Sequence, residues 1–246
     1  MGDSRISLPG WIASLAAAES LGMAAASAAA RLGEYSASAL FTLAVSIVAG
    51  AVEGAALGAV QGRLLATLSP RVNRRRFLWV TTVSAAVGWA LGMLPASMNS
   101  DSGSIGPEPP LWLILIAAAA MGMSMGALLG LAQSAALKGA FENRMPWFWG
   151  QLVAWTLAMP VIFLGATSVP AGIALGWLLL AGASTGGAAG VVLGLASWPF
   201  VFRLRPGGRF VSSVGTGSGS CLCFPFLDRL AKASIALCWG QRRIVR

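Results

Sequence analysis

Charged residues are scarce in this chain of 246 residues. They make up 10% of the sequence, whereas hydrophobic residues make up 57%. An ordinary soluble domain carries roughly 25% charged residues, because its surface must be wetted. The composition therefore excludes a soluble globular protein and indicates an integral membrane protein.

Histidine is absent, and the three cysteines, Cys221, Cys223 and Cys238, all lie near the C-terminus. A Cys/His zinc site and His-based acid–base catalysis are thereby excluded. Cys221 and Cys223 are separated by one residue, unlike zinc-binding or thioredoxin-like pairs, and we expect reduced thiols. Because the apolar segments contain no cysteine and few carboxylates, we expect no enzyme activity, no metal and no cofactor.

Acidic residues are outnumbered, since 17 Lys and Arg against 8 Asp and Glu give a net charge of +9. On a soluble protein this excess would suggest nucleic-acid binding. Here the cations lie in short clusters between apolar runs, which is typical of cytoplasmic loops in multi-pass membrane proteins. We expect the lipid bilayer as the partner, and no nucleic acid.

Six segments are apolar and long enough to cross a bilayer core of roughly 30 Å, which needs about 20 residues. The run from Met145 to Phe202 has no charge and must contain two helices, with a turn near Pro170 and Gly172. The first segment contains Glu19, and its alternative is a cleaved signal peptide, which would leave five spans. Within a transmembrane domain of residues 1–204, the predicted spans are 11–32, 39–66, 77–98, 111–137, 147–167 and 173–198.

The connections between the predicted spans alternate in charge. Arg71 and Arg74–Arg76 follow the second span, whereas the next connection, Asn99–Pro110, carries only acidic charges. Cation-rich loops remain in the cytoplasm, so both termini should be cytoplasmic in a cell membrane, most simply the bacterial inner membrane. Arg31 is an exception near the predicted outer face.

Residues 205–246 are predicted to form a cytoplasmic basic tail. Gly215–Ser220 has the composition of a flexible linker. Phe226–Trp239 places apolar residues at helical spacing beside Arg229 and Lys232, which predicts a short amphipathic helix on the inner leaflet.

Two sequence patterns alternate along the chain. Trp89–Met93 recurs as Trp155–Met159 and, imperfectly, as Glu19–Met23. A Gly-x3-Gly-x2-Gln pattern ends at Gln61 and Gln133, and a third copy has Ser197 in the Gln position. Self-similarity of this kind predicts an all-α membrane protein of three repeated helical hairpins.

The glycines of the second pattern extend into long series with four-residue spacing. Each series winds slowly around its helix and lets another backbone approach closely, which replaces the missing hydrophobic drive in lipid. Either the three repeat helices pack against each other, or the series form a homo-oligomer interface. The series consist of Gly50, Gly54, Gly58 and Gly62; Gly122, Gly126 and Gly130; and Gly182, Gly186, Gly190 and Gly194.

Glu53, Gln61 and Gln133 form the candidate intramembrane polar site, with Glu19 and Gln151 as further candidates. An ionised carboxylate in mid-membrane is costly, so Glu53 must be protonated, paired or in contact with water. The nearest cation on its helix, Arg63, is about 15 Å away along the axis. A neutral Glu53 bonded to a backbone carbonyl is the structural alternative. The two glutamines either cross-link helices or line a pathway.

These residues resemble a group of uncharacterised bacterial multi-pass membrane proteins, in which a Gly-x3-Gly-x2-Gln-Trp helix end precedes a basic turn and a Gly-Trp helix. The matching residues include Gly54, Gly58, Gln61, Arg74–Arg76 and Gly88-Trp89. The match continues at Gly126, Gly130 and Gln133 and ends at Gly190, Gly194 and Ser197-Trp198. Gly62 and Ser134 replace the Trp that would follow Gln. The resemblance implies the repeat architecture and supplies no activity.

Two functions are compatible with these features. The first is a non-enzymatic packing or assembly component that uses its glycine series for helix contacts. The alternative is a small solute or ion transporter, or a channel, with Glu53 in the pathway.

Overall fold

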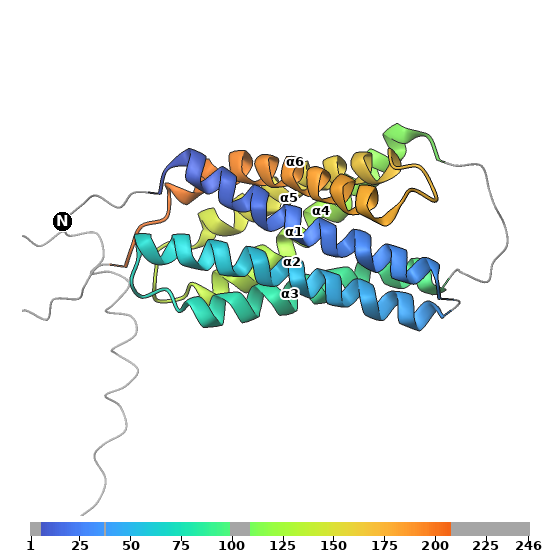
Figure 1. The fold of residues 1–246 in the computed structure, drawn as a ribbon. Coiled ribbons are helices and arrows are strands. Elements are labelled where there is room, and N and C mark those ends of the chain that lie inside the picture. The colour runs from blue at the N-terminus through green and yellow to red at the C-terminus, as the bar shows by residue number, and fades with distance from the viewer. Residues whose placement is uncertain (1–5, 37, 99–108, 208–246) are drawn as a thin grey trace, which may run out of the picture. The chain divides into compact units, whose positions relative to one another are not determined.

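The computed structural model describes residues 6–36, 38–98 and 109–207. These residues form six helices, each long and apolar enough to cross a membrane (Figure 1), so the predicted all-α membrane fold is confirmed. The predicted tail from residue 208 onward, with its three cysteines, lies outside the described residues. The helices are α1 (Leu8–Glu34), α2 (Ala39–Leu68), α3 (Arg74–Met98), α4 (Leu111–Ala136), α5 (Met145–Thr167) and α6 (Leu175–Val201).

Several helices extend beyond the predicted apolar spans. α3 begins at Arg74, because the Asn73 side chain accepts a hydrogen bond from the Arg76 N–H at 3.0 Å and so satisfies a free donor of the first turn. α1 begins similarly, with Ser7 accepting from the Gly10 N–H at 3.2 Å. Helices therefore continue into polar sequence where a cap is available, whereas the apolar run alone marks the length within the bilayer.

The six helices form a closed ring within the described residues. Each helix packs against its neighbours in the sequence, and α1 also packs against α6. The contacts are most extensive between α1 and α6, α2 and α3, and α4 and α5, and least extensive between α3 and α4. In Figure 1 the helices lie side by side, with their long axes aligned and consecutive helices running in opposite directions.

The glycine series line the three most extensive contacts. A Cβ atom on Gly54 would lie 2.6 Å from the Ala85 side chain of α3, and one on Gly126 would lie 2.6 Å from the Gln151 carbonyl oxygen of α5. One on Gly190 would lie 2.5 Å from Ala16 Cα of α1. Each glycine helix thus packs on a neighbouring helix that lacks the series, rather than on another glycine helix as predicted. Only glycine permits so close an approach.

These contacts also set the register of the odd-numbered helices. Gly122 meets Met159 and Gly186 meets Met23, but Gly50 at the equivalent position meets the Trp89 ring. Trp89 thus lies one helical turn away from the place that the Trp-Leu-Met pattern predicts for it. Short similarities between Ala-rich helices are poorly specific, so the Trp-Leu-Met pattern aligned Trp89 with the wrong helical turn.

The two ends of the bundle differ in their connections. The α2–α3 and α4–α5 connections lie at one end, which we call the basic end, together with residues 202–207. Ser69 Oγ and the Gly207 N–H both donate to the Ala140 carbonyl oxygen at 3.0 Å. The Glu142 N–H donates to the Arg205 carbonyl oxygen, also at 3.0 Å. The α1–α2 and α5–α6 connections lie at the opposite end, which we call the cavity end. Gly172, with φ of 75°, forms the predicted α5–α6 turn there.

Candidate functional site

The basic end of the bundle is filled by a layer of aromatic side chains from three helices. Trp147 of α5 meets Trp11 of α1 and Phe77 of α3 edge to face, with ring centroids 6.3 and 6.0 Å apart. All three side chains are buried. Such edge-to-face packing leaves little room for water between the helices at this level.

A hydrogen-bond network surrounds this aromatic layer and contains both predicted glutamines. Gln133 Nε2 donates to Gln61 Oε1 and to Thr81 Oγ1, each at 3.1 Å. Trp147 Nε1 donates to Gln133 Oε1 at 2.9 Å. The network links α2, α3, α4 and α5 through buried groups. These are the contacts of a structural cross-link, and neither glutamine lines the cavity described below.

The third repeat position takes part in a related contact. Trp11 Nε1 donates to Ser197 Oγ at 3.0 Å, and Ser197 Oγ donates onward to the Leu193 carbonyl oxygen at 2.6 Å. Indole N–H groups thus contact two of the three positions, Gln133 and Ser197. At the third position, Gln61, the aromatic residue of the layer is Phe77, which has no N–H to donate. Gln61 accepts its hydrogen bond from Gln133 instead.

A cavity of about 1030 Å³ occupies the other half of the bundle, and side chains from all six helices line it. Its lining runs from Glu53 and Trp155 in the middle of the bundle to Glu34 and Val169 at the cavity end. Most of the lining is apolar, with serine and threonine hydroxyls between. The cavity thus extends from the middle of the bundle to the cavity end, whereas the aromatic layer fills the basic end.

Glu53 lies on the floor of this cavity. Its side chain is 2% exposed, and Trp89 Nε1 of α3 donates to its Oε2 at 2.8 Å. Its other neighbour is Gly22 of α1, where a Cβ atom would lie 2.6 Å from Glu53 Cγ. The predicted polar site is therefore divided, because Glu53 borders the cavity and the two glutamines belong to the closed layer.

Glu19, a further candidate from the sequence, lies near Glu53 in the fold, which the sequence alone did not predict. It lies on α1 and is 0% exposed, and Gly22, one helical turn further along α1, lies against Glu53 of α2. Neither of its carboxyl oxygens has a hydrogen-bond partner among the described residues. A buried carboxyl group without a partner is costly and rare, which makes it a candidate for function. Gln151 is buried on α5 and does not border the cavity.

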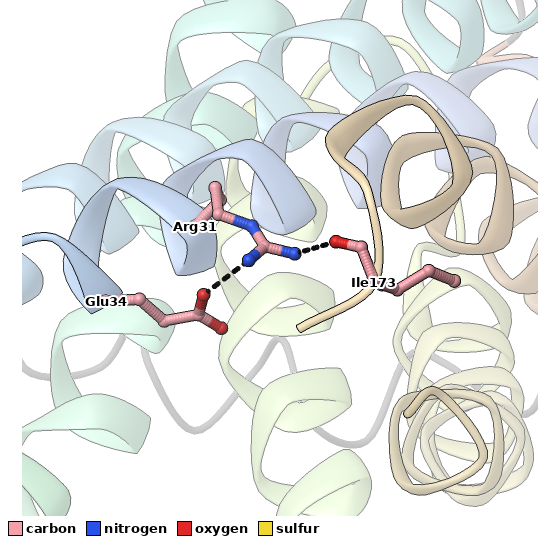
Figure 2. Close-up of polar contacts among 3 residues, drawn as sticks. All are labelled: Arg31, Glu34 and Ile173. Carbon is pink, nitrogen blue, oxygen red and sulfur yellow. Dashed lines mark hydrogen bonds and ion pairs between the residues drawn. The ribbon is translucent and has the colours of Figure 1, made fainter. Parts of the chain in front are cut away.

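Arg31 lies beside the exposed part of the cavity lining around Glu34, which we call the mouth of the cavity. Figure 2 shows its guanidinium between two partners: Nη1 lies 2.9 Å from Glu34 Oε2, and Nη2 donates to the Ile173 carbonyl oxygen. The end of α1 is thereby joined to the α5–α6 connection. Arg31 also lies in the last turn of its helix, where the helix dipole favours a cation. The exception in the loop charges is thus accounted for by local pairing.

The chemistry available at this site is limited to carboxyl, hydroxyl, indole and thioether groups. Within residues 6–36, 38–98 and 109–207, no cluster of three or more His, Cys, Asp or Glu could hold a metal ion. The chain matches no protein-family model, no curated protein and no solved structure. The cavity with Glu53 on its floor, and Glu19 buried behind it, is the candidate functional site.

Proposed function

We propose that this protein is a small-solute transporter of a cell membrane, not an enzyme, with the cavity as its solute site and Glu53 in the pathway. The observation that carries the proposal is the cavity of about 1030 Å³ between all six helices, with Glu53 on its floor. Pockets of about 300–1,000 Å³ hold drug-sized ligands. Carboxyl groups in the membrane interior are rare and mark solute or ion pathways in many membrane proteins.

The closed basic end supports transport rather than an open channel. A continuous pore would need water at the level of Trp11, Phe77 and Trp147, where the side chains are packed together. A site that is accessible from one side and closed on the other is one state of an alternating-access cycle. In the other state, the contacts of Gln133 with Gln61 and Trp147 would have to separate.

The charge of the connections supports an orientation for this cycle. The α2–α3 connection and the start of α3 carry Arg71, Arg74, Arg75 and Arg76. Loops rich in Arg and Lys remain in the cytoplasm. The basic end would then face the cytoplasm with both termini, and the cavity would take solute from outside the cell.

Assembly through the glycine series is the weaker proposal on packing grounds. Gly54, Gly126 and Gly190 are already covered by α3, α5 and α1 of the same chain. A second copy could reach these grooves only after the ring had opened. A homo-oligomer would instead use large apolar side chains that face outward, such as Leu21, Val83 and Leu195.

Solute uptake into proteoliposomes tests the proposal. The full chain and two variants, Glu53→Gln and, outside the cavity lining, Glu142→Gln, would be offered labelled quaternary ammonium ions, organic anions, amino acids and sugars. We expect uptake of one class above that of protein-free liposomes, lost in Glu53→Gln and retained in Glu142→Gln. Uptake that is no higher than that of protein-free liposomes for every class would reject transport.

A further inference from the structure

The cavity lining contains acidic side chains and, among the described residues, no basic one. Among its described lining residues, Glu34 and Glu53 are the only ionisable side chains. Glu34 is paired with Arg31 at 2.9 Å and lies at the mouth, where its side chain is largely exposed. The acidic group on the floor is therefore the Glu53 carboxyl, whose hydrogen-bond partner is the neutral Trp89 indole.

Glu19 adds a second carboxyl group behind the floor. Gly22, one helical turn further along α1, lies against Glu53, and both Glu19 oxygens are buried without a hydrogen-bond partner in the described part of the chain. Two neighbouring carboxyl groups in an apolar bundle are stable only when they are protonated or paired. A cationic ligand supplies a pairing charge, whereas carboxylates would repel an anionic ligand.

The walls of the cavity suit an apolar body. Five methionines line it, and their thioether chains adapt to ligands of different shapes. Trp89 and Trp155 lie near the floor, where indole rings attract cations. The methionines are Met23, Met93, Met121, Met125 and Met159.

The size of the cavity favours an organic cation over an inorganic one as its ligand. A volume of about 1030 Å³ is that of a site for a drug-sized molecule, and a metal ion would leave most of it unfilled. We infer that the cavity binds an organic cation with an apolar body, its charged centre beside Glu53 with Glu19 as the second anion. The class comprises quaternary ammonium and phosphonium ions and protonated hydrophobic amines. This inference rests on the proposed function and names its substrate class.

Two probes of nearly the same shape and opposite charge test the inference. Tetraphenylphosphonium is the cation, and tetraphenylborate is the anion. Binding of each to the purified full chain in detergent would be measured by equilibrium dialysis against protein-free micelles. We expect saturable binding of tetraphenylphosphonium alone. Equal binding of both ions, or no saturable binding of the cation, would overturn the inference.

Three variants connect the binding to the floor. Glu53→Gln should weaken tetraphenylphosphonium binding by about tenfold or more, since it removes the nearest charge in a low-dielectric site. Glu53→Asp keeps the charge and should retain most of the affinity, which guards against loss through misfolding. Glu142→Gln is the control, because Glu142 lies in the α4–α5 connection at the basic end and does not line the cavity, and we expect less than about a threefold change. An equal loss in Glu142→Gln and Glu53→Gln would contradict the assignment of the floor.

The outcomes also separate this inference from the proposed function. Tetraphenylphosphonium that binds through Glu53, while proteoliposomes take up no solute, would reject transport and support the ligand class. Glu53-dependent uptake of a sugar or an organic anion without tetraphenylphosphonium binding would support transport and reject the ligand class.

Discussion

The two ends of this helix bundle use polar side chains in opposite ways. At the basic end, Gln133 uses its amide to contact Gln61, Thr81 and Trp147, and all of these groups are buried. At the floor of the cavity, Glu53 has one indole partner, and Glu19, which is buried behind the floor, has none within the described residues.

The difference separates polar groups that hold the fold from those available to a ligand. Satisfied amides and hydroxyls cross-link helices and need nothing further. A buried carboxyl group without a partner, such as Glu19, carries a cost that a ligand or a proton can remove. The closed layer therefore holds the fold together and the floor is the part available to the proposed solute, although Glu53 and Gln61 lie on one helix.

The largest effect is expected where helix backbones meet. Gly126→Leu would drive a side chain into the Gln151 carbonyl group, since even a Cβ atom would lie 2.6 Å away. We expect a loss of about 3 kcal/mol in the free energy of unfolding, and disturbance of both ends of the bundle. Unfolding by SDS titration would measure it.

Gly176→Leu is the matched control, because a Cβ atom at Gly176 has no neighbour within 4 Å. It should leave the free energy of unfolding nearly unchanged. A similar loss in both variants would show that the close helix contacts do not carry the effect.

Gln133→Leu should weaken the closed layer specifically. It removes three hydrogen bonds. At roughly 0.6 kcal/mol for each interhelical bond in a membrane, the loss is about 2 kcal/mol. Gln61→Leu removes one of these bonds and should cost about a third as much, again by SDS titration. Equal losses would contradict the central place of Gln133 in the network.

Glu19→Met should act in the opposite direction. It replaces a buried, unpartnered carboxyl group with an apolar side chain of similar size, and we expect a gain of about 1 kcal/mol in the free energy of unfolding. Tetraphenylphosphonium binding should fall in the same variant. Glu19→Gln keeps a polar group without a partner and should bring no such gain. Destabilisation by Glu19→Met would show that Glu19 supports the fold.

The smallest effect is expected at the mouth of the cavity. Arg31→Gln removes the contacts to Glu34 and Ile173, which lie at the end of the bundle. Because the Glu34 side chain is largely exposed, we expect a loss of only about 0.5 kcal/mol in thermal-unfolding measurements. A loss as large as that of Gln133→Leu would mean that the mouth contributes as much to stability as the closed layer.

Much of this architecture can be predicted from the sequence. Helix number and most helix positions follow from apolar length, and the glycine series identify the positions of close contact. The partner of each series could not be predicted, because four-residue spacing marks a groove without stating which helix fills it. The shifted register of Trp89 and the approach of Glu19 to Glu53 were likewise inaccessible, since both depend on how the ring closes. The cavity is a property of the whole ring and has no local signal.

The most direct test of the central claim compares cysteine access at two serines with similar burial. Ser46 borders the cavity and is 5% exposed, whereas Ser197 belongs to the closed end and is 3% exposed. Each would be changed to Cys in full chains whose Cys221, Cys223 and Cys238 are serines, and treated in intact cells with a membrane-impermeant cationic thiol reagent. We predict labelling of Ser46→Cys, slowed by tetraphenylphosphonium, and no labelling of Ser197→Cys. Labelling of Ser197→Cys at the same rate, or no labelling of Ser46→Cys, would contradict a cavity that is open to the outside and closed at the basic end.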